Sequence, residues 1–131
     1  MQRRTVLVVD DEEFLRRMLA RVLDDAGFEV IEAENGAAAL KMARQTDGTL
    51  SLVVTDIHMP VMSGIEFARQ FQPLQPTVPL LFITGRDPAD ADDPSYRDAQ
   101  LLQKPFRSEA FLAAITRLLG GPSVSPREDS V

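Results

Sequence analysis

The sequence contains no cysteine and no long apolar run, and each absence excludes a class of structure or site. Without cysteine the chain cannot form a disulfide, a thiolate metal site or a cysteine nucleophile. No stretch approaches the roughly eighteen apolar residues that cross a membrane, so we expect no membrane contact, and we expect no secretory leader. A reduced, cytoplasmic setting is the expected location.

An excess of basic residues is also missing, because the formal net charge of the 131 residues is −6. Nucleic-acid binding needs clustered lysine and arginine to neutralise phosphates, whereas the basic residues here are scattered. We therefore expect no nucleic-acid binding by this domain. The acidic residues gather instead in residues 10–13 and 87–93, which favours a cation as the small partner.

Strand-like and helix-like segments alternate along the chain. Short β-branched runs predict strands at residues 5–10, 28–33, 50–56, 79–84 and 100–103. Apolar residues at helical spacing predict helices that include residues 14–23, 36–45, 64–72 and 109–119. Ser108 is the expected N-cap of the last helix. The alternation predicts an α/β fold, a doubly wound five-stranded parallel sheet flanked by helices.

Two segments depart from this regular pattern. Residues 85–99 contain Pro88 and Pro94, many acids and almost nothing apolar, so we expect any helix there to be short or irregular. Residues 121–131 are rich in Gly, Pro, Ser and charge, which predicts a flexible C-terminal tail or the start of a linker. One domain over residues 1–120 is the expected organisation.

Polar side chains stand where the predicted strands end, and in a parallel sheet these ends share one edge. The residues are Asp10, Asp11, Asp56, Thr84 and Lys104. Three nearby carboxylates repel each other unless a hard divalent cation such as Mg²⁺ joins them. The cation, an ammonium and a hydroxyl together can neutralise a transferring phosphoryl group, which leaves one carboxylate to attack it.

Four motifs in order make the chain resemble the receiver (CheY-like) domain of two-component response regulators. They are VVDDE at 8–12, VVTDIHMPVMSG at 53–64, FITG at 82–85 and QKPF at 103–106. The resemblance, from about Thr5 to Leu119, implies a flavodoxin-like strand order 2-1-3-4-5. It also implies a phosphoryl donor, either a histidine kinase or a histidine phosphotransfer protein, and a downstream effector protein. It implies no turnover enzyme and no output domain on this chain, and a homodimer is left open.

The resemblance also implies roles for single residues. Asp56 takes the phosphoryl group, Lys104 pairs first with Asp56 and then with that group, and Thr84 donates its hydroxyl to a phosphoryl oxygen. The implied Mg²⁺ ligands are Asp10, Asp11, Asp56 and the backbone carbonyl of His58. The implied switch or tuning positions are His58, Gly85, Arg86, Leu101 and Pro105, with a cis peptide bond before Pro105.

Other functions stay open on the sequence alone. A phosphorylation-independent interaction module is suggested by the irregular segment 85–99 but opposed by the intact set of acidic, hydroxyl and ammonium side chains. An aspartyl-phosphate phosphohydrolase would need a second aspartate two residues after the nucleophile, where this chain has His58. We therefore expect a phospho-acceptor that switches conformation to control a partner.

Overall fold

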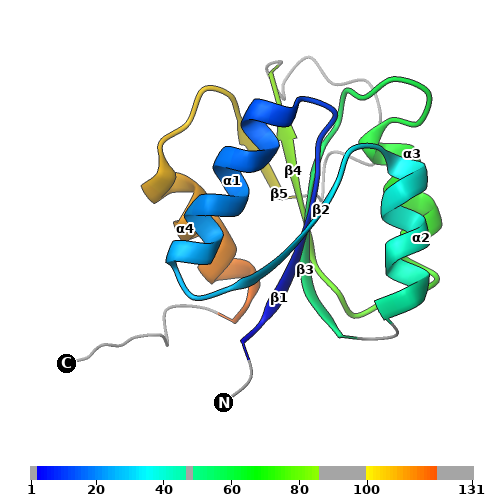
Figure 1. Ribbon diagram of the computed structural model, residues 1–131, viewed down its shortest axis with the longest axis horizontal. Coiled ribbons are helices and arrows are strands. Elements are labelled where there is room, and N and C mark those ends of the chain that lie inside the picture. The colour runs from blue at the N-terminus through cyan, green and yellow to red at the C-terminus, as the bar shows by residue number, and fades with distance from the viewer. Residues whose placement is uncertain (1–2, 47–48, 86–99, 121–131) are drawn as a thin grey trace.

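The computed structural model describes residues 3–46, 49–85 and 100–120, which form a parallel sheet between two pairs of helices (Figure 1). The sheet order is β2-β1-β3-β4-β5, as the family resemblance implied. The elements are β1 (Thr5–Val9), α1 (Glu13–Asp25), β2 (Glu29–Ala33), α2 (Gly36–Thr46), β3 (Leu50–Asp56), α3 (Gly64–Phe71), β4 (Leu80–Thr84), β5 (Gln100–Gln103) and α4 (Ser108–Leu118).

The central strands β1 and β3 are buried on both faces, because helices cover the sheet on each side. Side chains alternate between the two faces of a strand. Leu7, Val9 and Val53 therefore join the core under α2 and α3, whereas Val8 and Val54 join the core under α1 and α4. This arrangement explains why both strands are continuous apolar runs in the sequence.

The first helix, α1, buries only part of its apolar surface. Leu19 and Leu23 are buried against the sheet, but Phe14 is 82% exposed and Met18 is 44% exposed. The apolar spacing correctly predicted the helix, which ends before Gly27 with its positive φ of 99°. It did not reveal that two of its large apolar residues face solvent.

The third helix, α3, begins close to the end of β3. The Ser63 side chain accepts a hydrogen bond from the Glu66 N–H and so caps the helix. A Cβ atom on Gly64 would lie 2.2 Å from the Asp56 carbonyl oxygen, which no side chain can occupy. Glycine at this position therefore allows α3 to pack directly against the strand end that carries Asp56.

Three expectations concern the C-terminal half of the chain. The prediction that Ser108 caps the last helix is wrong, because Arg107 is the N-cap of α4 and Ser108 is its first residue. The expected irregular helix at 85–99 lies outside the described residues, apart from Gly85, and so does the tail at 121–131.

In the part of the chain that is described, no helix is long and apolar enough to cross a membrane.

Candidate functional site

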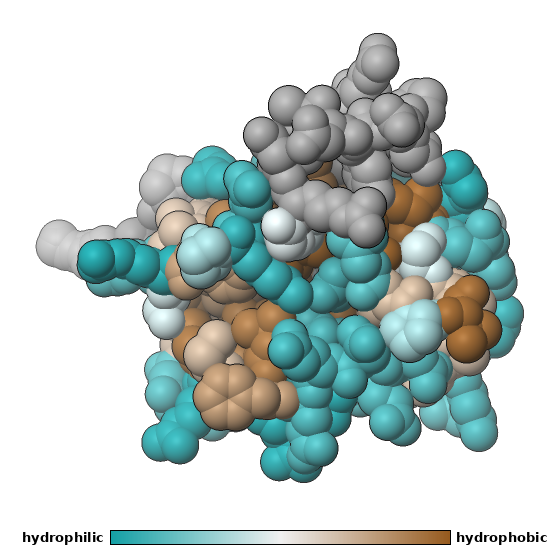
Figure 2. Space-filling model, turned by 90° about the horizontal axis from the view of Figure 1, so that it is seen from above, coloured by the Kyte–Doolittle hydropathy of each residue, from teal (hydrophilic) through white to brown (hydrophobic). Residues whose placement is uncertain are grey.

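The carboxyl ends of the strands meet at one edge of the sheet, at the top of Figure 1. Figure 2 looks down on this edge, where hydrophilic side chains cross the middle and hydrophobic ones lie on either side. An open depression there is lined by Asp11, Glu12, Asp56, His58, Gly85 and Lys104. The edge thus gathers most of the residues that the sequence placed at strand ends.

Asp56 is the last residue of β3 and is buried. One carboxylate oxygen, Oδ1, accepts a hydrogen bond of 2.8 Å from the His58 N–H, and the other, Oδ2, lies 2.7 Å from the Lys104 ammonium. Both oxygens are therefore held in place by donors on different loops. The strand keeps the backbone rigid, since the next residue, Ile57, donates its N–H to the Ile83 carbonyl on β4.

Asp10 follows β1 and is only 1% exposed. Its Oδ1 accepts a 2.9 Å hydrogen bond from the Glu12 N–H, whereas its Oδ2 is buried without a hydrogen-bond partner. Burial, with a smaller contribution from the negative charge of Asp56, raises the pKa of the Asp10 carboxyl to about 6, although the Glu12 hydrogen bond acts to lower it. A buried carboxylate oxygen without a partner is stabilised when it binds a cation or a proton.

Asp10, Asp11 and Asp56 together form a cluster with the composition of a hard-metal site. Each offers a carboxylate oxygen, and these oxygens lie within 4.8 Å of one another. Asp11 is exposed, while the other two are buried, so the cluster opens to solvent on one side. Oxygen-only ligation that leaves positions for water is the kind of site that Mg²⁺ prefers. The unpartnered Oδ2 of Asp10 fits this assignment.

Lys104 follows β5 and reaches back to β3 through its pairing with Asp56. Burial alone would lower the pKa of its ammonium, but the hydrogen bond and the charge of Asp56 outweigh burial, and the pKa is raised. The ammonium therefore stays charged at neutral pH. Its backbone N–H donates to the Thr84 carbonyl at 2.7 Å, which ties the ends of β4 and β5 together.

Thr84 is buried at the end of β4, where its neighbour in the sheet is Gln103. Because Asp56 pairs with Ile83 on the same strand, Thr84 lies one residue beyond the end of β3. This register puts the threonine at the same edge as Asp56 and Lys104. The sequence therefore predicted correctly which strand ends meet.

The positions for which the family resemblance implies a switch or tuning role are distributed around the site. His58 and Gly85 are exposed and line the depression, and a Cβ atom on Gly85 would meet no atom of the described residues within 4 Å. Leu101 on β5 is half-buried beside the cluster around Phe82. The Lys104–Pro105 peptide bond is cis, as expected. Arg86 lies outside the described residues.

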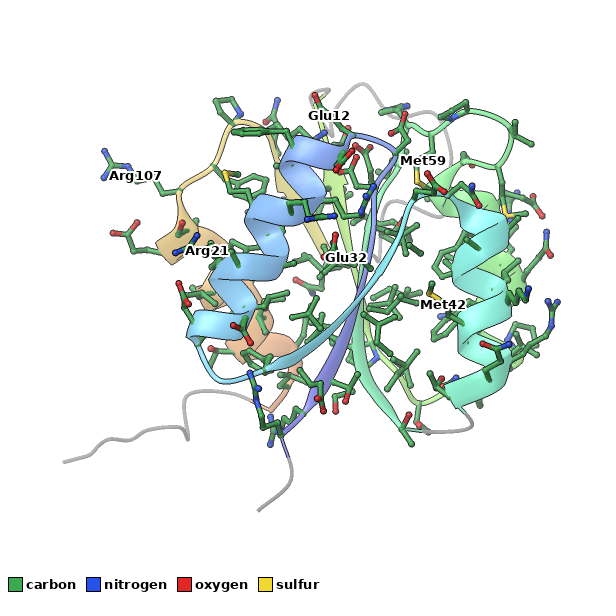
Figure 3. The ribbon with its side chains drawn as sticks, viewed as in Figure 1. Glu12, Arg21, Glu32, Met42, Met59 and Arg107 are labelled. Atoms are coloured by element: carbon green, nitrogen blue, oxygen red, sulfur yellow. The ribbon has the colours of Figure 1, made fainter. Side chains whose placement is uncertain are left out.

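Sequence reasoning missed two residues at this edge. Glu12 lines the depression, and its label in Figure 3 marks the upper end of α1. Arg16, one turn further along α1, donates from Nη1 to the Asp10 carbonyl oxygen at 2.9 Å. The DDEE run indicates an acidic stretch that includes Glu12, but it does not indicate that Glu12 lines the depression. For Arg16 no sequence signal was available, because its partner at the site is a backbone atom.

A family model for the response regulator receiver domain matches residues 6–116 of this chain. The response regulator receiver protein CpdR of Brucella abortus is 37% identical over 118 residues, which are 87% of this chain and 95% of CpdR. The transcriptional regulator NtrC of Escherichia coli K12 is 34% identical over 122 residues, 91% of this chain but only 25% of NtrC. This chain therefore spans nearly all of one relative and a quarter of the other.

Solved receiver structures share the fold as well. The chemotaxis response regulator CheY4 of Vibrio cholerae superimposes with a TM-score of 0.80 at 33% identity, covering 90% of this chain and 100% of CheY4. The receiver domain of the hybrid histidine kinase CckA gives a TM-score of 0.76 at 29% identity, with 88% and 98% covered. On fold, site and sequence, the chain belongs to the response regulator receiver domain family of two-component signalling.

Proposed function

We propose that this domain accepts a phosphoryl group on Asp56 from a phosphohistidine of a kinase or a histidine phosphotransfer protein. The observation that carries the proposal is the 2.7 Å contact between Lys104 Nζ and Asp56 Oδ2, next to three clustered carboxylates. A nucleophilic carboxylate with an ammonium beside it and an acidic metal site around it suits phosphoryl transfer. None of the three parts has this use alone.

In the proposed step, one carboxylate oxygen of Asp56 attacks the phosphorus atom of the donor phosphohistidine. The new O–P bond forms as the P–N bond breaks, and the donor imidazole leaves with the electron pair. The His58 N–H and the Lys104 ammonium orient the two oxygens of Asp56 before attack. Asp10, Asp11, Asp56 and the His58 carbonyl would hold Mg²⁺, which would supply positive charge to neutralise the phosphoryl oxygens.

After transfer, Lys104 exchanges its contact with the carboxylate for one with the phosphoryl group, and the Thr84 hydroxyl donates to another phosphoryl oxygen. Movement of Thr84 carries the adjoining Gly85. Leu101, which packs beside Phe82, stands where many receivers have an aromatic residue that turns inward, so that aromatic readout is not available in its usual form here. His58 and Arg86 set how long the phosphoryl group lasts, and Pro105 sets the angle of Lys104. These steps convert a local charge change into a conformational switch.

The proposed partners are the phosphoryl donor and a downstream effector protein in the cytoplasm, and the domain itself is not a turnover enzyme. This accords with relatives such as CpdR and NtrC, whose names describe regulators. Two other functions are not favoured. An interaction module has no need of the Asp56–Lys104 pair, and a phosphohydrolase would need a carboxylate at the position of His58.

Intact mass spectrometry after incubation with acetyl phosphate tests the proposal. We expect a gain of one phosphoryl group that requires Mg²⁺ and is absent from Asp56→Asn. The matched control is Asp25→Asn, an exposed aspartate at the far end of α1, which should gain the group like the wild type. If neither acetyl phosphate nor a phosphohistidine donor protein modifies the wild type, the proposal is wrong.

A further inference from the structure

We infer that Arg16 is a positioning residue for the metal site, because it holds the turn that carries Asp10 and Asp11. Its guanidinium joins this turn to β2 through Glu32. The inference rests on the proposed Mg²⁺ binding but assigns a role to a residue that does not itself bind the metal. It predicts that metal affinity depends on a helix side chain outside the acidic cluster.

The Arg16 side chain makes two directed contacts. Nη1 donates to the Asp10 carbonyl oxygen at 2.9 Å, and Nε donates to Glu32 Oε1 at 3.1 Å. The side chain is only 12% exposed. Figure 3 shows Glu32 in the space between α1 and β2. Fixing a long arginine side chain costs conformational entropy, so its two hydrogen bonds must offset this cost for the side chain to stay in one position.

These contacts complete the fixation of Asp10 from both sides. The Asp10 N–H donates to the Ala33 carbonyl at the end of β2 at 3.1 Å, and the Asp10 carbonyl accepts from Arg16. The Glu12 N–H then holds Asp10 Oδ1, and the Glu12 carbonyl accepts from the Arg16 N–H. The direction of the free Asp10 Oδ2 is therefore set by a closed set of bonds between β1, β2 and α1.

Loss of the Arg16 side chain would remove one of these bonds and leave the buried Asp10 carbonyl without this donor. The turn would then gain freedom at the point where two carboxylates must converge on one cation. Groups that orient metal ligands from outside commonly change metal affinity by about tenfold or more when they are removed. We therefore expect weaker Mg²⁺ binding, although the loss of one positive charge would by itself favour a bound cation.

The neighbouring Arg17 provides a matched control. Its Nε lies 3.5 Å from the same Glu32 oxygen, so it has the same charge and shares one partner with Arg16. It is 66% exposed, its other ion pair is with Glu13, and none of the described hydrogen bonds joins it to Asp10. Arg17→Met thus removes a charge beside Glu32 without touching the Asp10 turn.

Isothermal titration calorimetry of the full chain with MgCl₂ measures the effect directly. Arg16→Met should weaken Mg²⁺ binding by about tenfold or more, whereas Arg17→Met should change the affinity by less than about twofold. Arg16→Lys should recover part of the loss, since an ammonium can still donate to the Asp10 carbonyl. Urea unfolding in EDTA establishes that each variant is folded at the titration temperature.

Folded Arg16→Met with wild-type Mg²⁺ affinity would overturn the inference, and so would equal losses in Arg16→Met and Arg17→Met. If Arg16→Met does not fold, Glu32→Ala replaces it, because it removes the anchor of Arg16 and leaves the acidic cluster intact. Glu32→Ala must then bind Mg²⁺ more weakly than Arg17→Met does, and equal affinities contradict the inference. Failure of the wild type to bind Mg²⁺ would instead reject the proposed metal site.

Discussion

The charge of Asp10 depends strongly on the fold. Burial raises the pKa of this carboxyl from 3.8 to about 6, with the charge of Asp56 as a second cause. Because this value lies above the ordinary one, the folded metal-free protein holds a proton more tightly than the unfolded chain does. Proton binding by Asp10 therefore makes its full contribution to the free energy of unfolding below about pH 4. This contribution is lost as pH rises through about 6.

The Asp10→Asn variant tests this charge cost. Each pKa unit corresponds to about 1.4 kcal/mol, so we expect the metal-free variant to gain about 2–3 kcal/mol of unfolding free energy at about pH 7. At about pH 4 the gain should nearly vanish, because the wild-type carboxyl is then protonated. Urea unfolding in EDTA at both pH values measures it. An equal gain at both pH values would mean that the charge of Asp10 is not the cause. The control is the exposed Asp25→Asn, which should change the unfolding free energy little.

Val61, in the loop after Asp56, has a backbone conformation that β-branched residues rarely adopt. Its φ is 70°, and a 2.8 Å hydrogen bond from the Met62 N–H to the Pro60 carbonyl closes a tight turn around it. Its side chain is fully exposed, so no packing offsets the strain. The site thus carries backbone strain within five residues of its proposed nucleophile.

Relief of this strain should stabilise the protein. Val61→Asn is expected to raise the unfolding free energy by about 1 kcal/mol, because asparagine tolerates positive φ far better than valine. Thermal unfolding measures the change. Val61→Thr, which keeps the branched Cβ, is the matched control and should give no gain. A similar gain from threonine would show that loss of an exposed apolar group, and not backbone strain, is responsible.

Among the secondary structure elements, α3 packs directly against the strand end that carries Asp56. A Cβ atom on Gly64 would lie 2.2 Å from the Asp56 carbonyl oxygen and 2.9 Å from Ile57 Cα. Both are backbone atoms, so the helix or the strand end would have to move. A Cβ atom on Gly36 at the start of α2 would meet the side chain of Met62, which is flexible.

Gly64→Ala should therefore cost more than Gly36→Ala. We expect Gly64→Ala to lower the unfolding free energy by about 2–3 kcal/mol and to slow phosphorylation by acetyl phosphate, because Asp56 is displaced. Gly36→Ala should cost less than about 1 kcal/mol, since alanine also favours the helix. Urea unfolding and intact mass give the two readings. If Gly64→Ala is the milder variant, the close packing does not set the position of Asp56.

For the molecule as a whole, the exposed apolar side chains on α1 stand close to the proposed site. Phe14 lies in the first turn of α1, directly after the acidic loop, and Met18 lies one turn further. Exposed aromatic residues beside a reactive group are typical anchors for a protein partner. Leu74, also exposed, follows α3 and precedes β4, which puts it at the opposite edge of the sheet.

Phe14→Ala should separate the two kinds of phosphoryl donor. We expect transfer from a phosphohistidine protein to slow by about tenfold, because an anchoring contact is lost, while the reaction with acetyl phosphate stays unchanged. Rates of phosphoprotein formation measure both. Leu74→Ala should leave both rates at the wild-type value. A Phe14→Ala variant that is equally slow with acetyl phosphate would indicate damage to the site, and not to donor docking.

The sequence was sufficient to bring Asp10, Asp11, Asp56, Thr84 and Lys104 to one edge. Alternating strands and helices imply a parallel sheet, and the carboxyl ends of parallel strands share an edge whatever the details of packing. The strand order followed from the family resemblance, and the family model matches residues 6–116. The meeting of the five residues at one edge, unlike the strand order, needed only the order of elements along the chain and the residue at the end of each strand.

Tertiary structure alone decided which apolar residues of α1 are covered and that Arg16 reaches the Asp10 carbonyl. Helical spacing does not say how far a neighbouring element extends over each turn, so Phe14 and Leu19 look alike in the sequence. The Arg16 contact joins α1 to a backbone atom of the β1–α1 turn and to Glu32 on β2, and no residue pattern records such a bond. Local pattern determines elements and strand ends, whereas long-range contacts exist only once those elements have packed.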